Sequence, residues 1–506
     1  MNKISFLAVL LPALALQAAE PAKAPSPATN NPAATNSLGS IPDAAHPPVT
    51  ITNSVVIAGE RVTYTAETGM LPLLKPDGTS RASVFYVAYT RTGLTNKAAR
   101  PVMFCYNGGP GSASLWLHLG ALGPRRVKLN DDGTLPPPPF TLVDNEYSPL
   151  GASDLVMIDP VQTGYSRPAK DEKAEQFFGA QGDVDAIGEF IRLWTTRHER
   201  WLSPKYLLGE SYGAFRSAGV AQELNDHYGL YLNGVVLVSG VLDFATLEAS
   251  TGNDLPYRLI LPAYTATAHF HHKLPPELQA DRAAALAEAR AFAGGEYLSA
   301  LAAGAALAPE ERTKVIAELA RLTGLKPELI KDYNLRVDPG VFRKQLLHDE
   351  GLVLGSYDAR LTGRDGNPAS PYAEVDPADT ATMGPFSAAV NSYLRTELKF
   401  QDDLPYEIFG DVHPWKYGAD NSYPDVSGRL ATVMNENPYL RLLVFGGKCD
   451  LVCPVDTMRH SLEHMPLAEA YRTNITYAEF DAGHMMYINL PDLKKMQREL
   501  VRFVTR

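Results

Sequence analysis

The chain has 506 residues and a formal net charge of −11. Because single hydrophobic cores stop growing near roughly 250–300 residues, we expect one core with a sizeable insertion or second domain. The acidic balance argues against nucleic acid as a partner, since nucleic-acid affinity comes from concentrated positive charge. The three cysteines, Cys105, Cys449 and Cys453, are too few for a disulfide framework.

The first 19 residues predict a secretory signal peptide. Lys3 precedes the apolar stretch Ile4–Leu16, and small residues follow at Ala18 and Ala19. The stretch is shorter than the ~20 residues that a membrane-spanning helix needs, so no stable membrane insertion is expected. A Pro/Ala-rich flexible leader is predicted over residues 20–50. We expect a periplasmic or secreted protein, and the sequence leaves its oligomeric state open.

Short apolar runs rich in β-branched or aromatic residues predict buried strands. They are Val102–Tyr106, Leu155–Ile158, Tyr206–Leu208, Val235–Val238, Leu442–Phe445 and Ile475–Phe480. Helical apolar spacing lies between them, as in the segment from Val184 to Trp194, for which Asp183 is the expected N-cap. Strands that alternate with helices predict a doubly wound, mostly parallel sheet of the α/β class.

The alternation of strands and helices is interrupted once. Ala-rich helical patterns, including Ala283–Ala293 and Glu310–Leu322, replace it and then give way to strands again. Such a segment can pack its own core or cover the C-terminal edge of the sheet. The predicted organisation is a first core part at 51–244, a helical cap insertion at 245–399 and a second core part at 400–506.

A pentapeptide of the form G-x-S-x-G, Gly209–Gly213, follows the predicted strand Tyr206–Leu208 and precedes a helical pattern. In this strand–turn–helix setting it is typical of the nucleophile elbow of the α/β-hydrolase fold. Glycines are needed because a β-carbon at either flank of so sharp a turn would collide with neighbouring backbone. We therefore predict an α/β-hydrolase fold with Ser211 as the nucleophile.

A serine nucleophile needs a general base, and in this fold the acid and then the histidine follow it along the chain. Asp450 and His484 each lie in a loop that follows a predicted strand, so both belong to the same sheet edge. The alternatives are His413, His460 and His464 for the base and Asp456 and Asp481 for the acid. We prefer Asp450 because Asp481 is too close in sequence to orient the ring of His484, and Asp456 falls in a predicted helix.

A second Gly-rich segment, Asn107–Ser112, directly follows the predicted strand Val102–Tyr106. In hydrolases such a loop supplies one backbone N–H to the oxyanion hole, and the residue after the nucleophile supplies the other. Gly109 and Tyr212 are the candidate donors. Taken alone, the segment is also compatible with a plain turn.

The sequence predicts no metal ion and no organic cofactor. Cys449 and Cys453 lack the second ligand cluster that a zinc site requires. The histidines His269, His271 and His272 lie without spaced carboxylates or cysteines, so we interpret them as an exposed face of the insertion.

Five segments occur in the order found in the serine carboxypeptidase family, which the chain resembles from about residue 80 to its end. They are Asn107–Ser112, Asp159–Ser166, Gly209–Gly213, Asp450–Cys453 and Gly483–Met485. The resemblance implies a catalytic triad of Ser211, Asp450 and His484. It also implies Gly109 and Tyr212 as oxyanion donors and Cys453 near the substrate pocket, with peptides as substrates.

In that family an asparagine and two glutamic acids that share a proton bind the C-terminal carboxylate of the substrate. Asn107 and Glu210 match the asparagine and one glutamate, whereas Ala121 stands at the position of the other. Without a close carboxylate partner, we expect Glu210 to ionise near neutrality and repel a carboxylate, which weakens the preference for acid. Ser112 in place of a cysteine and Tyr487 in place of a proline resemble a bacterial branch.

The leading hypothesis is a serine carboxypeptidase-like peptidase that hydrolyses C-terminal peptide bonds through an acyl-enzyme on Ser211. A proline-releasing aminopeptidase and an esterase are alternatives on the same fold. Asn107 and the Asp450–Cys453 segment favour the carboxypeptidase, whereas Ala121 favours the alternatives. A non-catalytic binding protein is a further alternative, which the presence of all three triad residues disfavours.

Overall fold

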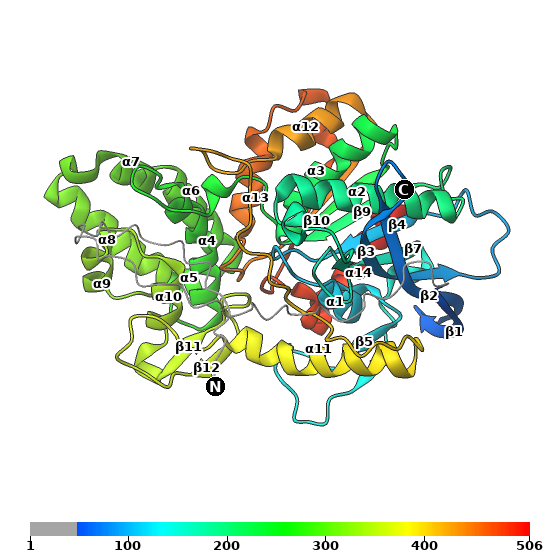
Figure 1. Cartoon of the computed structure of the whole chain (residues 1–506). Coiled ribbons are helices and arrows are strands. Elements are labelled where there is room, and N and C mark those ends of the chain that lie inside the picture. Colours follow the sequence, from blue (N-terminus) through cyan, green and yellow to red (C-terminus); the bar gives the residue numbers. More distant parts are fainter. Residues whose placement is uncertain (1–47) are drawn as a thin grey trace, which may run out of the picture. The chain divides into compact units, whose positions relative to one another are not determined.

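The computed structural model describes residues 48–506, and its centre is a ten-stranded sheet (Figure 1). The strand order is β1-β2-β3-β7-β4-β9-β10-β13-β14, with β8 paired to β3. Strands β1, β2, β3 and β7 pair antiparallel, and the strands from β7 to β14 run parallel to one another. The predicted signal peptide and nearly all of the predicted leader lie outside the described residues.

The strands of the main sheet are β1 (Val49–Ile57), β2 (Glu60–Leu74), β3 (Ser80–Arg91), β4 (Val102–Tyr106), β7 (Asp154–Ile158), β8 (Arg167–Pro168), β9 (Lys205–Glu210), β10 (Gly234–Val238), β13 (Arg441–Gly447) and β14 (Ile475–Phe480). Two small antiparallel pairs are formed by β5 (Arg125–Val127) with β6 (Leu142–Asp144) and by β11 (Leu352–Leu354) with β12 (Thr362–Arg364). The predicted α/β class with a mostly parallel sheet is confirmed.

The parallel strands β4, β7, β9 and β10 are buried on both faces, because alternate side chains enter two separate hydrophobic clusters, whereas the edge strand β14 is mostly half-buried. In β4, Phe104 packs with one cluster and Cys105 with the other. The Phe104 face is covered by α2 (Ala180–Arg197), α3 (Tyr212–Tyr228), α12 (Ser427–Glu436) and α13 (Val455–His464). The Cys105 face is covered by α11 (Pro377–Thr396) and α14 (Leu490–Thr505).

The predicted start of α2 is wrong. The helix begins at Ala180 with Gly179 as its N-cap, so Asp183 lies inside the first turn. There the Asp183 carboxylate is buried and pairs with the guanidinium of Arg216 on α3. A long-range ion pair therefore explains a side chain that the local pattern assigned to a cap.

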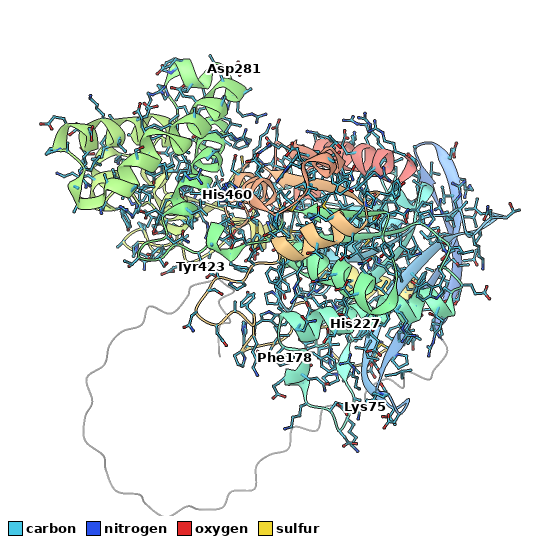
Figure 2. The ribbon with its side chains drawn as sticks, turned by 90° about the horizontal axis from the view of Figure 1, so that it is seen from above. Lys75, Phe178, His227, Asp281, Tyr423 and His460 are labelled. Carbon is cyan, nitrogen blue, oxygen red and sulfur yellow. The ribbon has the colours of Figure 1, made fainter. Side chains whose placement is uncertain are left out.

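The helices between β10 and β11 form a third hydrophobic cluster of their own (Figure 1). They are α4 (Leu255–Phe270), α5 (Pro276–Gln279), α6 (Arg282–Gly294), α7 (Glu296–Ala303), α8 (Pro309–Thr323), α9 (Pro327–Asp332) and α10 (Pro339–Gln345). Helix α4 packs against α13, the helix that carries His460, while Asp281 lies away from this contact (Figure 2). The cluster includes Cys449 and Leu451, so these helices pack against the loop after β13.

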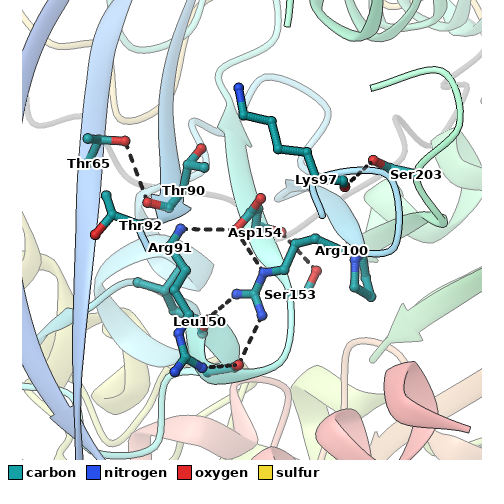
Figure 3. Close-up of polar contacts among 12 residues, drawn as sticks. Thr65, Thr90, Arg91, Thr92, Lys97, Arg100, Leu150, Ser153, Asp154 and Ser203 are labelled. Carbon is teal, nitrogen blue, oxygen red and sulfur yellow. Dashed lines mark hydrogen bonds and ion pairs between the residues drawn. The ribbon is translucent and has the colours of Figure 1, made fainter. Parts of the chain in front are cut away.

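A buried carboxylate, Asp154, anchors the edge of the sheet at which the parallel strands begin (Figure 3). Its Oδ1 accepts hydrogen bonds from the Arg91 backbone and from Arg100 Nε, both at 3.1 Å. Its Oδ2 accepts one from Arg200 Nη1 at 2.6 Å. Because Arg100 precedes β4 and Arg200 precedes β9, the network fixes the starts of neighbouring strands, and their far ends carry the site described next.

Within residues 48–506, no helix has both the length and the apolar character needed to cross a membrane.

Candidate active site

Ser211 occupies the sharp turn between β9 and α3. Its backbone has φ 60° and ψ −126°, a conformation that a residue with a side chain adopts only under strain. A β-carbon at Gly209 would collide with the carbonyl oxygen of Gly213, and one at Gly213 would lie 3.1 Å from that of Tyr106. The two glycines therefore permit the turn, which leaves Ser211 partly accessible between buried neighbours.

Asp450 and His484 form a buried hydrogen-bonded pair. The Nδ1 atom of His484 lies 2.7 Å from Oδ2 of Asp450, and neither side chain is more than 3 % exposed. The other carboxylate oxygen, Oδ1, accepts the backbone N–H groups of Val452 and Cys453 at 2.8 and 2.9 Å. This orientation fixes which nitrogen of the imidazole faces the acid and leaves Nε2 as the outward nitrogen.

The end of β10 joins the loop of Ser211 to the loop of His484. The Ser211 N–H donates to the carbonyl of Val238 at 2.9 Å, and the next residue, Ser239, donates its hydroxyl to the carbonyl of His484 at 2.7 Å. The three candidate triad residues thus lie at the carboxyl ends of parallel strands, where α/β sheets bind ligands.

The segment 356–359, which lies between β11 and β12, braces the other side of this site. Tyr357 accepts the His484 N–H at 2.5 Å, and Ser356 accepts the Leu451 N–H at 3.1 Å. Gly483 must be glycine, because a β-carbon there would collide with the Tyr357 carbonyl. One segment distant in sequence therefore positions both the acid loop and the histidine loop, which no local motif could reveal.

The hydroxyl of Ser211 interacts with the thiol of Cys453. Within the described range, no hydrogen bond joins Ser211 to His484. Burial raises the pKa of Cys453 well above its usual value, with the charge of Asp450 adding to the effect, so the thiol is neutral. Cys453 therefore lies at the predicted nucleophile as an uncharged neighbour.

The Gly-rich loop after β4 packs directly on the elbow. A β-carbon at Gly108 would lie 2.5 Å from the Tyr212 nitrogen, and Gly109 has φ +103°, which favours glycine. In the part of the chain that the structure describes, neither the Gly109 N–H nor the Tyr212 N–H has a hydrogen-bond acceptor. One unpaired backbone donor thus follows Ser211 in the chain, and another lies in the loop that packs on the Ser211 turn, as an oxyanion hole requires.

A completely buried arginine, Arg216, supports both of these donors. Its Nε donates to Asp183 at 2.7 Å and its Nη1 donates to the Asn107 carbonyl at 2.6 Å. The guanidinium also lies 5.3 Å from the ring centroids of Tyr106 and Tyr212. Because Asn107 precedes the glycine loop and Tyr212 follows the nucleophile, Arg216 links the two sides of the site. Sequence reasoning missed this residue.

Glu210 is buried beside the nucleophile and contacts Asn107, the other residue that the resemblance assigns to binding of the substrate carboxylate. Oε1 of Glu210 accepts a hydrogen bond from Asn107 Nδ2 at 2.9 Å, while Asn107 Oδ1 accepts the Leu117 N–H at 3.0 Å. Burial raises the pKa of Glu210 to about 7. The sequence shows only that the carboxylate neighbour is missing, whereas loss of solvent raises this pKa without such a neighbour.

The pKa of His484 results from opposing effects. Burial lowers it, whereas the charge and hydrogen bond of Asp450 and the charge of Glu210 raise it, and the net pKa is above the ordinary value for histidine. The protonated imidazolium is therefore stabilised by its carboxylate neighbours, as a general base that accepts a proton requires.

The alternative acids and bases have other partners. Asp456 forms an ion pair with Arg290 at 2.7 Å, and Asp481 pairs with Lys448 at 2.9 Å and also with Arg282. The rings of His460 and His464 on α13 contact each other, with their centroids 3.9 Å apart. Among the described residues, none of these side chains contacts the turn that carries Ser211.

The histidines at the C-terminal end of α4, His269, His271 and His272, do not form the fully exposed face that was expected. The rings of His269 and His271 are half-buried and bond to the carbonyls of Gln279 and Ala359. Across residues 48–506, no three His, Cys, Asp or Glu side chains are grouped as a metal ion requires. All three cysteines are free and buried.

The sheet order, the strained serine after β9 and the His484–Asp450 pair at the same edge define an α/β-hydrolase fold. The family model described as serine carboxypeptidase matches residues 60–266. Residues 60–266 are therefore similar to the serine carboxypeptidases, which confirms the suspected resemblance to that family.

Two relatives from Arabidopsis thaliana are similar in part. Serine carboxypeptidase-like 13 is 28% identical over 32% of this chain and 36% of its own length. Serine carboxypeptidase-like 16 is 28% identical over 36% of this chain and 41% of its own length. The chain thus spans about two fifths of the length of these relatives. The crystal structure of Kex1Δp, a prohormone-processing carboxypeptidase from Saccharomyces cerevisiae, matches with a TM-score of 0.52 at 16% identity, over 87% of this chain and 91% of that one. This match supports the fold.

Proposed function

We propose that the chain is a serine carboxypeptidase-like peptidase that hydrolyses C-terminal peptide bonds through an acyl-enzyme on Ser211. The observation that carries the proposal is the buried pair of His484 and Asp450, 2.7 Å apart, at the sheet edge that holds the strained Ser211. If the pair of His484 and Asp450 were only structural, it would not require a serine with a strained backbone at the same sheet edge. Nucleophilic catalysis requires the serine, the histidine and the acid together.

In the proposed acylation step, the hydroxyl of Ser211 turns from Cys453 toward His484 and gives its proton to Nε2. The serine oxygen attacks the scissile carbonyl carbon, and the resulting oxyanion accepts hydrogen bonds from the N–H groups of Gly109 and Tyr212. His484 then donates the proton to the leaving amine as the carbon–nitrogen bond breaks. Asp450 stays ionised and stabilises the imidazolium.

Deacylation repeats the same proton transfers with water in place of serine. Water gives a proton to His484 as its oxygen attacks the ester carbonyl, and the proton passes to the departing Ser211 oxygen. The products are the shortened peptide acid and the free enzyme. This sequence uses only side chains of the chain itself.

Removal of a C-terminal residue, rather than an N-terminal one, is supported by the contact of Asn107 with Glu210 and by the family match over residues 60–266. A proline-releasing aminopeptidase or an esterase remains the second candidate, because Ala121 leaves a carboxyl missing from the family pattern. Peptides are the proposed substrates in the leading case. Export to the periplasm or the exterior is proposed from the sequence of residues 1–19.

A fluorophosphonate probe tests the nucleophile, because it labels only activated serines. We expect labelling of the wild type and of Ser299→Ala, which removes an exposed serine on α7, and no labelling of Ser211→Ala. Undiminished labelling of folded Ser211→Ala would rule out Ser211. Absence of labelling in the folded wild type would favour a non-catalytic binding protein.

A further inference from the structure

Two buried polar atoms next to the nucleophile have incomplete hydrogen bonding. They are Oε2 of Glu210 and the hydroxyl oxygen of Tyr487, and neither completes a hydrogen bond of ordinary geometry. The residues are 3 % and 2 % exposed. Because buried polar groups are rarely left unsatisfied, such a pair beside a reactive serine indicates a place for a ligand.

Tyr487 comes from the short helix η8 (Met486–Ile488), three residues after His484. Its hydroxyl interacts with the side chains of Glu210 and Asn107. The ring lies so close to Gly120 that a β-carbon there would be 2.6 Å from Cε2. The aromatic ring thus packs against Gly120, the residue before Ala121, where the family pattern has a second glutamate.

The ionisable and polar groups that face Glu210 come from three loops. They are Asn107 after β4, Asp450 and Cys453 after β13, and His484 and Tyr487 after β14. Burial raises the pKa of Glu210 to about 7, and burial and the charge of Glu210 raise the pKa of Tyr487 well above its usual range. Below neutrality both groups are therefore protonated and can donate hydrogen bonds.

We propose that the Tyr487 hydroxyl is a second donor to the C-terminal carboxylate of the substrate, beside the protonated Glu210 that the family resemblance implies, at the place where Ala121 supplies no carboxyl. A carboxylate oxygen that enters between Oε2 of Glu210 and the Tyr487 hydroxyl accepts one hydrogen bond from each. Asn107 holds the other oxygen of Glu210 and thereby directs Oε2 toward the ligand. This inference rests on the proposed carboxypeptidase function and names the group that makes it selective.

The site gives a definite pH dependence. Below pH ~7 Glu210 is neutral and donates, and above it the carboxylate repels the carboxylate of the substrate. The kcat/KM for a free-acid peptide therefore falls as pH rises through this range, whereas that for the peptide amide does not. The Tyr487 hydroxyl stabilises the anion of Glu210 and so lowers the pKa of Glu210. Removal of this hydroxyl should therefore move the alkaline limb of the pH profile of kcat/KM for the free-acid peptide to higher pH.

The test compares Tyr487→Phe with the wild type on a blocked dipeptide as its free acid and as its C-terminal amide, from pH 5 to 9. We expect the KM for the free acid to rise about tenfold or more, as for a lost hydrogen bond to a charged group, and the acid-to-amide selectivity to fall. The alkaline limb should move upward. Glu210→Gln, which cannot ionise, should abolish that limb for the free acid.

Tyr297→Phe is the matched control, because Tyr297 is a buried tyrosine whose hydroxyl donates to Leu335 away from the site. Equal losses on acid and amide in Tyr487→Phe, or an unmoved alkaline limb, would overturn the proposal and leave the carboxypeptidase function standing. A wild type that has Ser211-dependent activity but no preference for the free acid would instead overturn the proposed function. Circular dichroism and thermal unfolding establish that each variant is folded.

Discussion

Replacement of Arg216 by methionine tests whether one buried cation supports the predicted oxyanion loop. Methionine keeps much of the side-chain length but removes the ion pair to Asp183, the hydrogen bond to the Asn107 carbonyl and the contacts with the rings of Tyr106 and Tyr212. We expect losses of both stability and activity, because the same guanidinium stabilises the core and holds the loop.

The stability loss follows from burial. Arg216 is 0% and Asp183 5% exposed in their side chains, so the variant leaves a buried carboxylate without its partner. Breaking a buried pair in this way costs about 3–5 kcal/mol. In the double variant Arg216→Met/Asp183→Asn no charge remains, so the loss should be smaller than the sum of the two single losses by about 1–3 kcal/mol.

The pH dependence has a defined sign. Burial already raises the pKa of Asp183 and Arg216 opposes this effect, so removal of Arg216 raises the folded-state pKa further above the unfolded value. The destabilisation therefore grows as pH rises above the unfolded-state pKa, and it is smaller at pH 5 than at pH 8. The double variant should not show this added dependence.

Urea unfolding at both pH values measures these differences for the wild type, the two single variants and the double variant. A parallel assay of ester hydrolysis measures kcat, which we expect to fall at least tenfold in Arg216→Met even where the protein remains folded. Additive losses of stability, or full kcat in folded Arg216→Met, would refute the assigned role.

Three further predictions concern the triad acid, the loop of His484 and the cysteines. Asp450→Asn should lower kcat by roughly 10³–10⁴-fold with little change in KM, measured on an ester substrate, since the acid fixes the imidazole and stabilises its cation; a loss below tenfold would exclude Asp450 as the triad acid. Gly483→Ala should lower kcat because its β-carbon collides with the Tyr357 carbonyl and displaces His484, whereas Gly294→Ala meets no atom within 4 Å and should retain activity; equal activity of the two variants would contradict the bracing by Tyr357. The three cysteines are buried, so an aromatic disulfide reagent should titrate none in the native protein and all three in denaturant; fast reaction of a native thiol would contradict their burial.

Local pattern was enough to predict the strands that carry the site. The runs at Leu155–Ile158 and Val235–Val238 are apolar throughout because parallel strands are covered on both faces. Strand β1 escaped prediction because most of its residues are exposed or half-buried, so it has no continuous apolar run. The strained turn at Ser211 was predictable because its flanking glycines are required by sterics alone.

Features that depend on distant partners could not be predicted from pattern. Asp183 looks like a cap in sequence, and only the fold brings it to Arg216. Tyr487 looks like a simple departure from a family proline, and only the structure brings its hydroxyl to Glu210. The raised pKa of Glu210 comes from burial, which no count of charged neighbours reveals.

The most direct test of the central claim is the hydrolysis of one blocked dipeptide as its free acid, its C-terminal amide and its ester by the purified protein, from acidic to neutral pH. We predict a preference for the free acid that is abolished by Ser211→Ala and is strongest below pH ~7, where Glu210 is protonated. Preference for the amide or ester with the same dependence on Ser211 would contradict it and assign another substrate class to this serine.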